Sequence, residues 1–185
     1  MESHFHEAIC LAAVEILGEK EAYNVMKAMG ISSFSNASSS RYSLAELGRE
    51  LAHRYDPQIA MGLLIRLGRA SLTFLRRSFP MISELGAIEN RLKPVDKRFP
   101  FSLNVMAEVA GAELGSTITV TGQSGLSYDW KVETADPYFT PYYHFGLLEE
   151  FCYWLDSRKD YQIAYAIDPS DSGLADLNIK IKELE

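Results

Sequence analysis

The chain is poor in the residues on which most soft-metal and redox sites depend. Its 185 residues include only two cysteines and four histidines. Cys10 and Cys152 each lie in an apolar helical pattern, which is typical of buried, reduced thiols, although the sequence leaves a disulfide open. A chain of this length buries roughly 70% of its unfolded surface, so its core requires neither a disulfide nor a metal.

Positive charge is also scarce, with 18 basic against 25 acidic residues and a net charge of −7. This deficit argues against nucleic-acid binding, which requires a basic face. It equally disfavours attachment to anionic membranes through charge. A local basic patch formed by Arg66, Arg69, Arg76 and Arg77 remains compatible with the composition.

Long hydrophobic runs are missing. None approaches the roughly 18 residues of a membrane-spanning helix, and no signal segment opens the chain. We therefore expect a soluble, cytoplasmic protein without a membrane span. The sequence also lacks a nucleophile motif, a zinc-protease motif and a glycine-rich phosphate loop. These absences argue against an enzyme, although catalytic groups can also come together from distant residues.

The first half of the chain has helical periodicity. Apolar residues recur every three or four positions in residues 1–31, with a break at Gly18, and a serine-rich loop follows at residues 32–41. Ser43 and Glu46 form a predicted capping box at the start of the next helix.

The following helix, residues 57–79, begins with Asp56 as its N-cap and Pro57 in its first turn. It is apolar on nearly all sides. Gly62 and Gly68 lower its helix propensity, so we expect another backbone or a ligand to approach closely there. Residues 81–100 are predicted to be irregular or a short helix, ended by Pro94 and Pro100.

The second half combines helices with alternating segments. A helix is predicted at residues 101–114 and another at residues 142–155. Period-two alternation predicts strands at residues 117–121, 126–133, 161–167 and 177–181, arranged as two hairpins. We therefore predict a single α+β domain over residues 1–185, with a helical N-terminal half on an antiparallel sheet of about four strands.

Several segments together resemble the 4-vinyl reductase family of small-molecule-binding domains. They are residues 62–70, residues 92–98, Trp130 ahead of Val132 and Glu133, and residues 145–154 before the last two strands. Residues 8–31 are similar to the opening of the related haem-based nitric-oxide-binding domains. Both groups resemble vesicle-tethering transport-particle (TRAPP) subunits in fold. The resemblance implies an interior apolar pocket and a homodimer.

The sequence departs from these families at their cofactor positions. The 4-vinyl reductase sequences carry a Cys-Pro-x-Cys-like motif where this chain has Asp136-Pro137-Tyr138-Phe139, and residues 165–176 lack the expected cysteine. Thiolates are the ligands of soft metals, so a cysteine-bound metal is disfavoured. Haem is disfavoured too, because residues 56–142 contain no histidine and no Tyr-x-Ser-x-Arg motif is present. We expect no cofactor.

The candidate ligand-binding residues combine charge with aromatic surface, and the pocket is predicted between residues 57–79 and the sheet. Arg66 and Arg69 could bind an acidic head group, pair with structural carboxylates or extend to the surface. His144 could ligate or titrate, or be a hydrogen-bonded histidine at the rim of the core. The aromatic residues could line a pocket or form the core and a dimer interface. The full set is Arg66, Arg69, Leu63, Phe74, Tyr128, Trp130, Tyr138, Phe139 and His144.

Two further clusters have an ordinary structural explanation. His4 and His6 with Glu7 could hold a metal, but a solvated terminus is the simpler interpretation. Asp168, Asp171 and Asp176 could suggest calcium, yet their spacing does not match an EF-hand and fits an acidic hairpin loop.

These observations lead to three functional hypotheses. The first is non-catalytic binding of a small hydrophobic ligand (a lipid, a hydrocarbon or a tetrapyrrole precursor) by a sensor or carrier. The second is a ligand-free dimeric adaptor, with Tyr138 and Phe139 filling the space where relatives keep thiols. The third is an accessory protein of tetrapyrrole biosynthesis, which rests on family analogy.

Overall fold

The computed structural model describes residues 4–31, 42–122, 127–134, 136–157, 160–169 and 175–183. The predicted serine-rich loop (residues 32–41) and Asp171 lie outside the described residues. In chain order the elements are α1 (His4–Leu17), α2 (Glu19–Ala28), α3 (Leu44–Tyr55), α4 (Pro57–Ser78), α5 (Pro80–Leu85), α6 (Ile88–Arg91), α7 (Val95–Leu114), β1 (Ile118–Gly122), β2 (Ser127–Thr134), α8 (Thr140–Leu155), β3 (Tyr161–Pro169) and β4 (Ala175–Glu183).

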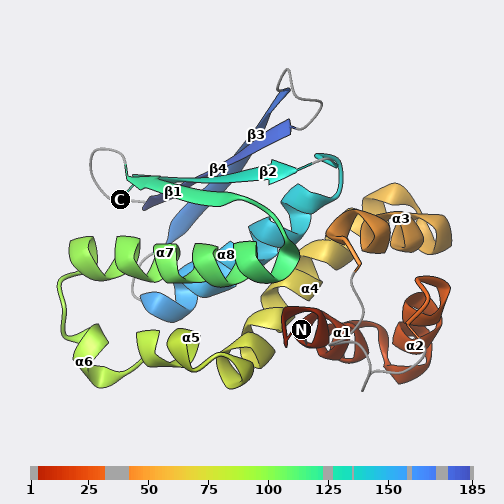
Figure 1. The fold of residues 1–185 in the computed structure, drawn as a ribbon, viewed down its shortest axis with the longest axis horizontal. Coiled ribbons are helices and arrows are strands. Elements are labelled where there is room, and N and C mark those ends of the chain that lie inside the picture. Colours follow the sequence, from red (N-terminus) through yellow and green to blue (C-terminus); the bar gives the residue numbers. More distant parts are fainter. Residues whose placement is uncertain are drawn as a thin grey trace.

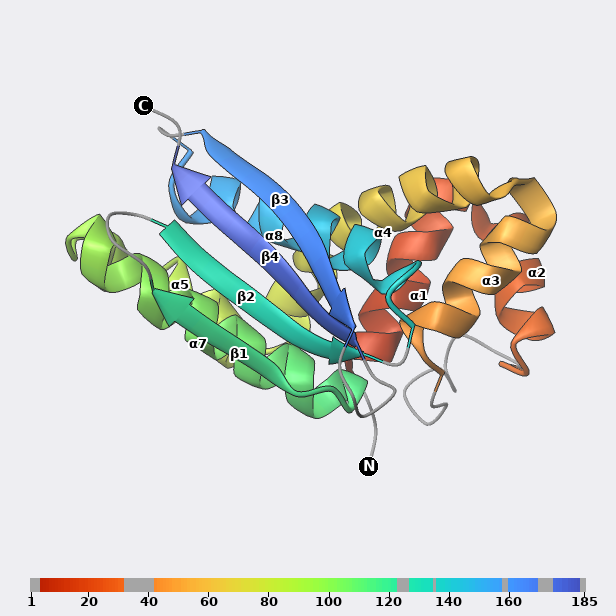
Figure 2. The ribbon, with the colours of Figure 1, turned by 90° about the horizontal axis from the view of Figure 1, so that it is seen from above.

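The described strands form one antiparallel sheet in the order β1-β2-β4-β3 (Figure 2). Each predicted hairpin pairs its own two strands, and β2 joins the hairpins by pairing with β4, with Trp130 opposite Ile179. The α+β prediction is therefore confirmed.

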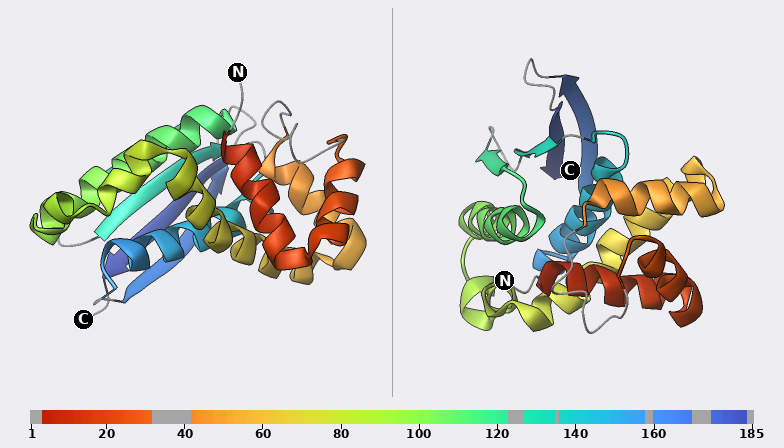
Figure 3. Two further views of the ribbon diagram at one scale, coloured as in Figure 1. Left: turned by 90° about the horizontal axis from the view of Figure 1, so that it is seen from below. Right: turned by 45° about the vertical axis from the view of Figure 1, so that its right-hand side comes forward.

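The helices gather on one side of the sheet (Figures 1 and 3). Helix α7 packs against β1, and α8 packs against β3 and β4. The next layer contains α4, which lies against α8, and α1, which lies against α4 and α7. Helix α8 thus separates α4 from the sheet, so the predicted pocket between residues 57–79 and the sheet does not form in that place.

The helix signals in the first half were accurate. Gly18 breaks the N-terminal helical segment with φ of 82°, a conformation that glycine adopts without steric cost. Ser43 and Glu46 form the predicted capping box. The Asp56 side chain accepts a hydrogen bond from the Gln58 amide at the start of α4, as its N-cap position predicts.

Close contact between α4 and α8 explains one of the two predicted glycine positions. A Cβ atom at Gly68 would collide with the backbone of Tyr143 and Leu147, and one at Gly146 would collide with the backbone of Ile65. Glycine is therefore required on both helices where they cross. Gly62, by contrast, has no other atom within 4 Å of its virtual Cβ, so close approach does not explain it.

The prediction that Pro100 ends a helix was wrong. Helix α7 runs from Val95 to Leu114 and contains Pro100 near its N-terminal end. Proline there removes one backbone donor, yet the residues around it are held by burial of Phe99 and Leu103, both fully inaccessible. Tertiary packing thus overrides the local signal.

An aromatic stack joins α7 to the sheet. The Phe99 ring lies 5.5 Å from Tyr128 and 4.8 Å from Tyr161, measured between centroids. Tyr128, Trp130 and Val132 are buried, as their period-two spacing predicts. Both cysteines are free and buried, which confirms their interpretation as reduced thiols.

Candidate functional site

A cleft of about 470 Å³ opens where α3 begins, α7 ends, β2 ends and α8 begins. We call it the His144 cleft. Its lining combines hydroxyl, charged and a few apolar side chains: Ser43, Leu44, Ala45, Arg49, Leu114, Gly115, Ser116, Thr117, Glu133, Thr134, Asp136, Thr140 and His144. Four segments distant in sequence therefore contribute to one polar surface.

Local sequence signals position these walls. The capping box of Ser43 and Glu46 fixes the first turn of α3 at one edge. Gly115 ends α7 in the left-handed conformation with φ of 65°, which turns the chain towards β1 and exposes Ser116 to the cleft. Helix α8 then starts at Thr140 without a side-chain cap.

His144 is the buried titratable group of this cleft, with 1% of its surface exposed. Its Nδ1 atom has no hydrogen-bond partner among the described residues. Burial lowers the pKa of His144 to about 4, because the charged form cannot be solvated there. The imidazole is therefore neutral at pH 7 and retains a nitrogen able to hydrogen-bond or to ligate.

The indole of Trp130 lies beside this imidazole, with 6.1 Å between ring centroids. The Trp130 Nε1 atom is also buried without a hydrogen-bond partner in the described part of the chain. Leaving a buried polar atom unpaired costs roughly 1–3 kcal/mol. Two such atoms therefore lie on neighbouring buried rings.

The rim of the cleft carries a loose ion pair. Arg49 Nε lies 3.7 Å from Asp136 Oδ2, and the Arg49 side chain is 63% exposed. The Thr134 hydroxyl donates to the Asp136 carbonyl (3.3 Å) and lies 3.4 Å from the Thr140 hydroxyl. Such a surface can bind a ligand that carries carboxylate or hydroxyl groups next to an apolar part.

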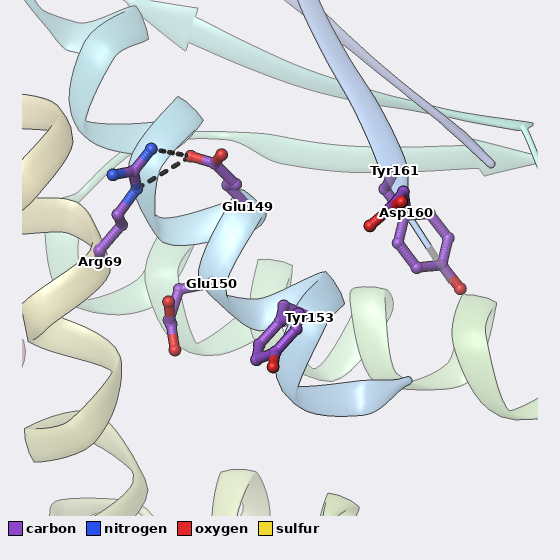
Figure 4. Close-up of a pocket in the computed structure, with 6 residues that line it drawn as sticks. All are labelled: Arg69, Glu149, Glu150, Tyr153, Asp160 and Tyr161. Carbon is purple, nitrogen blue, oxygen red and sulfur yellow. Dashed lines mark hydrogen bonds and ion pairs between the residues drawn. The ribbon is translucent and has the colours of Figure 1, made fainter. Parts of the chain in front are cut away.

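Arg69 lies in a different cleft, shown in Figure 4. It donates from Nε and Nη2 to Glu149 Oε2, at 2.9 and 2.5 Å. The structure thus favours the predicted alternative in which this arginine pairs with a carboxylate. Glu150 and Tyr153 follow along α8 in the same cleft, which is therefore rich in acidic groups.

The other α4 candidates do not converge. Arg66 is exposed, whereas Leu63 and Phe74 are half-buried and pack against the core. Leu63 and Phe74 are eleven residues apart, which is about 16 Å along a helix. They cannot line one compact site with His144.

The aromatic candidates serve different purposes. Tyr128 and Trp130 are buried under the sheet, whereas Tyr138 is 54% exposed. Phe139 is buried against Gly48 of α3. Of the sequence candidates, only His144 lines the His144 cleft. Trp130 does not line it but has its ring beside that of His144.

The expectation of a solvated N-terminus holds for His4 but not for His6. His6 is buried, and its Nε2 atom lies 2.8 Å from the Tyr42 carbonyl oxygen. His4 is exposed and lies 3.5 Å from Glu7. Among the described residues, no group of three or more His, Cys, Asp or Glu side chains could hold a metal ion. No described helix is long and apolar enough to cross a membrane.

Sequence reasoning missed most of the cleft's polar wall. Ser43 was recognised as a helix cap and Asp136 only as a residue standing where the 4-vinyl reductase sequences carry a cysteine. Arg49, Thr134 and Thr140 gave no signal, because isolated polar residues near element ends are common on any protein surface. Only the fold brings them together.

Comparison with known proteins supports the fold and leaves the family open. No family model matches the chain, and no curated protein does. Solved structures do match. The chain is similar to an oxygen-binding H-NOX domain related to soluble guanylate cyclases, in its oxygen complex, with a TM-score of 0.68 and 11% identity over 100% of this chain and 96% of that one.

Two further structures show the same likeness. One is the I5F mutant of T. tengcongensis H-NOX, with a TM-score of 0.68, 11% identity, and coverage of 100% of this chain and 98% of that one. The other, described as "Modulating Heme Redox Potential Through Protein-Induced Porphyrin Distortion", has a TM-score of 0.68 and 9% identity over 100% and 96% of the two chains. The chain thus has an H-NOX-like fold.

This likeness corrects the expectation of a cofactor-free protein. The fold is shared with proteins studied for the redox potential of their haem, so haem becomes a candidate cofactor here. His144 has the chemistry of a haem ligand, since it is a neutral imidazole and its residue lines the cleft. Arg49 fits a carboxylate. The hydroxyl-rich lining departs from the apolar walls that suit a porphyrin face. Helix α7 carries no histidine, and the histidine that lines this cleft, His144, comes from α8.

Proposed function

We propose that this chain is a small-molecule-binding domain of the sensor or carrier type, and that its ligand site is the His144 cleft. The observation that carries the proposal is a buried, neutral imidazole with an unpartnered nitrogen beside a cleft of about 470 Å³. The H-NOX-like fold supports it, because the similar structures include an oxygen-binding domain.

The lining chemistry narrows the ligand class. The hydroxyls and the Arg49–Asp136 pair favour a ligand with polar groups over a plain lipid or hydrocarbon. Leu44, Ala45 and Leu114 supply the apolar contacts. Of the ligands that the 4-vinyl reductase resemblance implies, a tetrapyrrole suits this combination best, and haem is the first to test.

Haem would be held by His144 as the nitrogen ligand and by Arg49 opposite a propionate. Bound haem would supply an iron centre for binding a diatomic gas. The protein's own part is to keep the imidazole neutral by burial and to limit water access through Trp130 and the first turn of α8. We also propose a homodimer, which rests on the family resemblance.

A titration with haemin tests the site. Absorption spectra of wild type should show one saturable bound form, and His144→Ala should lose it, because His144 is the histidine among the described residues that line this cleft. His53→Ala, an exposed histidine on α3, is the matched control and should bind like wild type. Equal binding by His144→Ala and wild type would contradict the assignment of the ligand. A metal-free porphyrin, followed by fluorescence, tests the broader tetrapyrrole proposal.

A further inference from the structure

A second cleft, of about 310 Å³, surrounds the start of α7 and the end of α8. Its lining consists of Arg91, Arg98, Trp154, Leu155, Asp156 and Ser157, none of which lines the His144 cleft. Arg98 is the notable member because an arginine is seldom fully buried, and this one is only 3% exposed. We call this the Arg98 cleft.

One edge of the Arg98 guanidinium has no hydrogen-bond partner among the described residues. Nη1 donates to the Arg91 carbonyl at 3.1 Å, but in this part of the chain Nε and Nη2 are buried without an acceptor. These two nitrogens present parallel N–H groups along one edge of the planar guanidinium. That edge is the one through which arginine binds carboxylate or phosphate with two hydrogen bonds.

Asp156 balances this charge without filling the edge. Its Oδ2 atom lies 3.7 Å from Arg98 Nη2, which is too long for a hydrogen bond. Both side chains are almost inaccessible, at 3% and 2% exposure. The pair is therefore close enough to attract but leaves both donors of the edge unused.

The surrounding sequence favours an anion. Residues 76–101 contain six basic and three acidic residues, a net charge of +3, in a chain whose net charge is −7. Arg91 is exposed at the mouth of the cleft. Arg76 lies over the Trp154 ring, with its Cζ atom 4.4 Å from the centroid. The local field thus attracts small anions that the rest of the molecule repels.

We propose that the Arg98 cleft binds an oxyanion, a carboxylate or phosphate group of a small molecule, on the Nε and Nη2 edge of Arg98. Arg91 adds a second positive charge at the mouth. Asp156 occupies part of the approach and turns aside when the anion binds, so it competes with the ligand. This site is independent of the His144 cleft and of any ligand there.

Thermal unfolding of the full chain tests the proposal. Sodium phosphate and sodium acetate are titrated separately at constant ionic strength, with sodium chloride as the balancing salt. Wild type should show saturable stabilisation by at least one anion. Arg98→Gln should weaken that anion's affinity by more than about tenfold, since a charge-assisted bidentate contact is lost. Whether phosphate or acetate is preferred identifies the head group.

Lys97→Gln is the matched control, because it removes the same charge from the exposed neighbouring position. It should bind the anion within about twofold of wild type, since exposed charges are largely screened. Stabilisation that does not saturate, or that Lys97→Gln reduces as strongly as Arg98→Gln, would overturn the proposal.

Asp156→Asn gives a test that does not depend on the folding of the Arg98 variant. Removing the competing carboxylate should tighten anion binding by at least about threefold, the direction that removal of a nearby like charge predicts. A purely structural ion pair predicts no gain. Unchanged or weaker anion binding by Asp156→Asn would contradict competition between Asp156 and the anion for Arg98. It would overturn the proposed anion site as well.

Discussion

At the scale of single residues, His144 determines part of the protein's response to acid. Its folded pKa is about 4, against an ordinary value of 6.5, so it stays neutral while the unfolded chain takes up a proton. The contribution of the buried neutral His144 to the free energy of unfolding is therefore fully present above pH 6.5. It is lost as the pH falls from 6.5 to 4.

The stability curve should show this titration. Between pH 7 and pH 4 the difference in pKa lowers the free energy of unfolding by roughly 3 kcal/mol. In His144→Gln this part of the pH dependence should disappear. Urea unfolding of both proteins at several pH values measures the difference. Parallel curves for wild type and His144→Gln would contradict the buried neutral state.

The capping box of Ser43 stabilises α3 and one edge of the His144 cleft. The Ser43 hydroxyl accepts from the Glu46 amide at 3.1 Å, and the Glu46 carboxylate accepts from the Ser43 amide at 2.7 Å. Ser43→Ala should lower the free energy of unfolding by about 1 kcal/mol. Denaturant melts check this value. An unchanged denaturant midpoint in Ser43→Ala would show that the capping box does not contribute to stability.

Arg69 illustrates a residue whose role is modest. Its ion pair with Glu149 is about half exposed on each side, so solvent screens the attraction. We expect Arg69→Ala to change the free energy of unfolding by less than about 1 kcal/mol. We also expect it to leave ligand binding at the His144 cleft unchanged. Weaker ligand binding by Arg69→Ala would instead indicate that Arg69 takes part in the ligand site.

Residue roles were only partly predictable from the sequence. His144 stood out because a histidine among aromatic residues is conspicuous in any chain. Its unpartnered Nδ1 and the cleft beside it depend on four segments meeting, which no local pattern encodes. No sequence pattern pointed to a role for Arg98 for the same reason, since its burial arises from α6, α7 and α8 together.

At the scale of elements, the crossing of α4 and α8 fixes the layered arrangement. Gly68 and Gly146 bring the two backbones into contact, and a Cβ at either position would collide with backbone atoms, which cannot move aside. Gly68→Ala should therefore lower the free energy of unfolding by about 1–3 kcal/mol, the usual cost of overpacking.

Gly62→Ala is the matched control on the same helix, since its added methyl group meets no other atom within 4 Å. Helix propensity then dominates, and the substitution should raise the free energy of unfolding by about 0.5–1 kcal/mol. The same denaturant melts measure both variants. A lower free energy of unfolding for Gly68→Ala together with a higher one for Gly62→Ala would support the close crossing of α4 and α8. A destabilised Gly62→Ala would contradict it.

Element order was readable from periodicity, and the main error was at α7. The sequence pattern predicted that a helix ends at Pro100, whereas α7 continues through this residue. Burial of Arg98, Phe99 and Ser102 around the proline holds the helix together. The pairing of β2 with β4 also lay beyond the sequence, since alternation identifies strands but not the partners that join two hairpins.

At the scale of the whole molecule, the sheet is covered from one side, and the described helices leave its other face open (Figure 2). Exposed Lys131, Glu133, Gln162 and Lys180 alternate with buried neighbours, as expected for an antiparallel sheet with one solvated face. The hydrophobic interior is thus occupied by helix–sheet packing, and the His144 cleft lies at its edge.

Binding of a small molecule at the His144 cleft is tested most directly by native mass spectrometry. The freshly purified protein is incubated with haemin, and the same sample is then measured by denaturing mass spectrometry. We predict an added mass that denaturation removes, present in wild type and His53→Ala and lost in His144→Ala. A native mass of the bare chain or bare dimer in all three proteins would contradict the claim for haem and direct the search to protein partners.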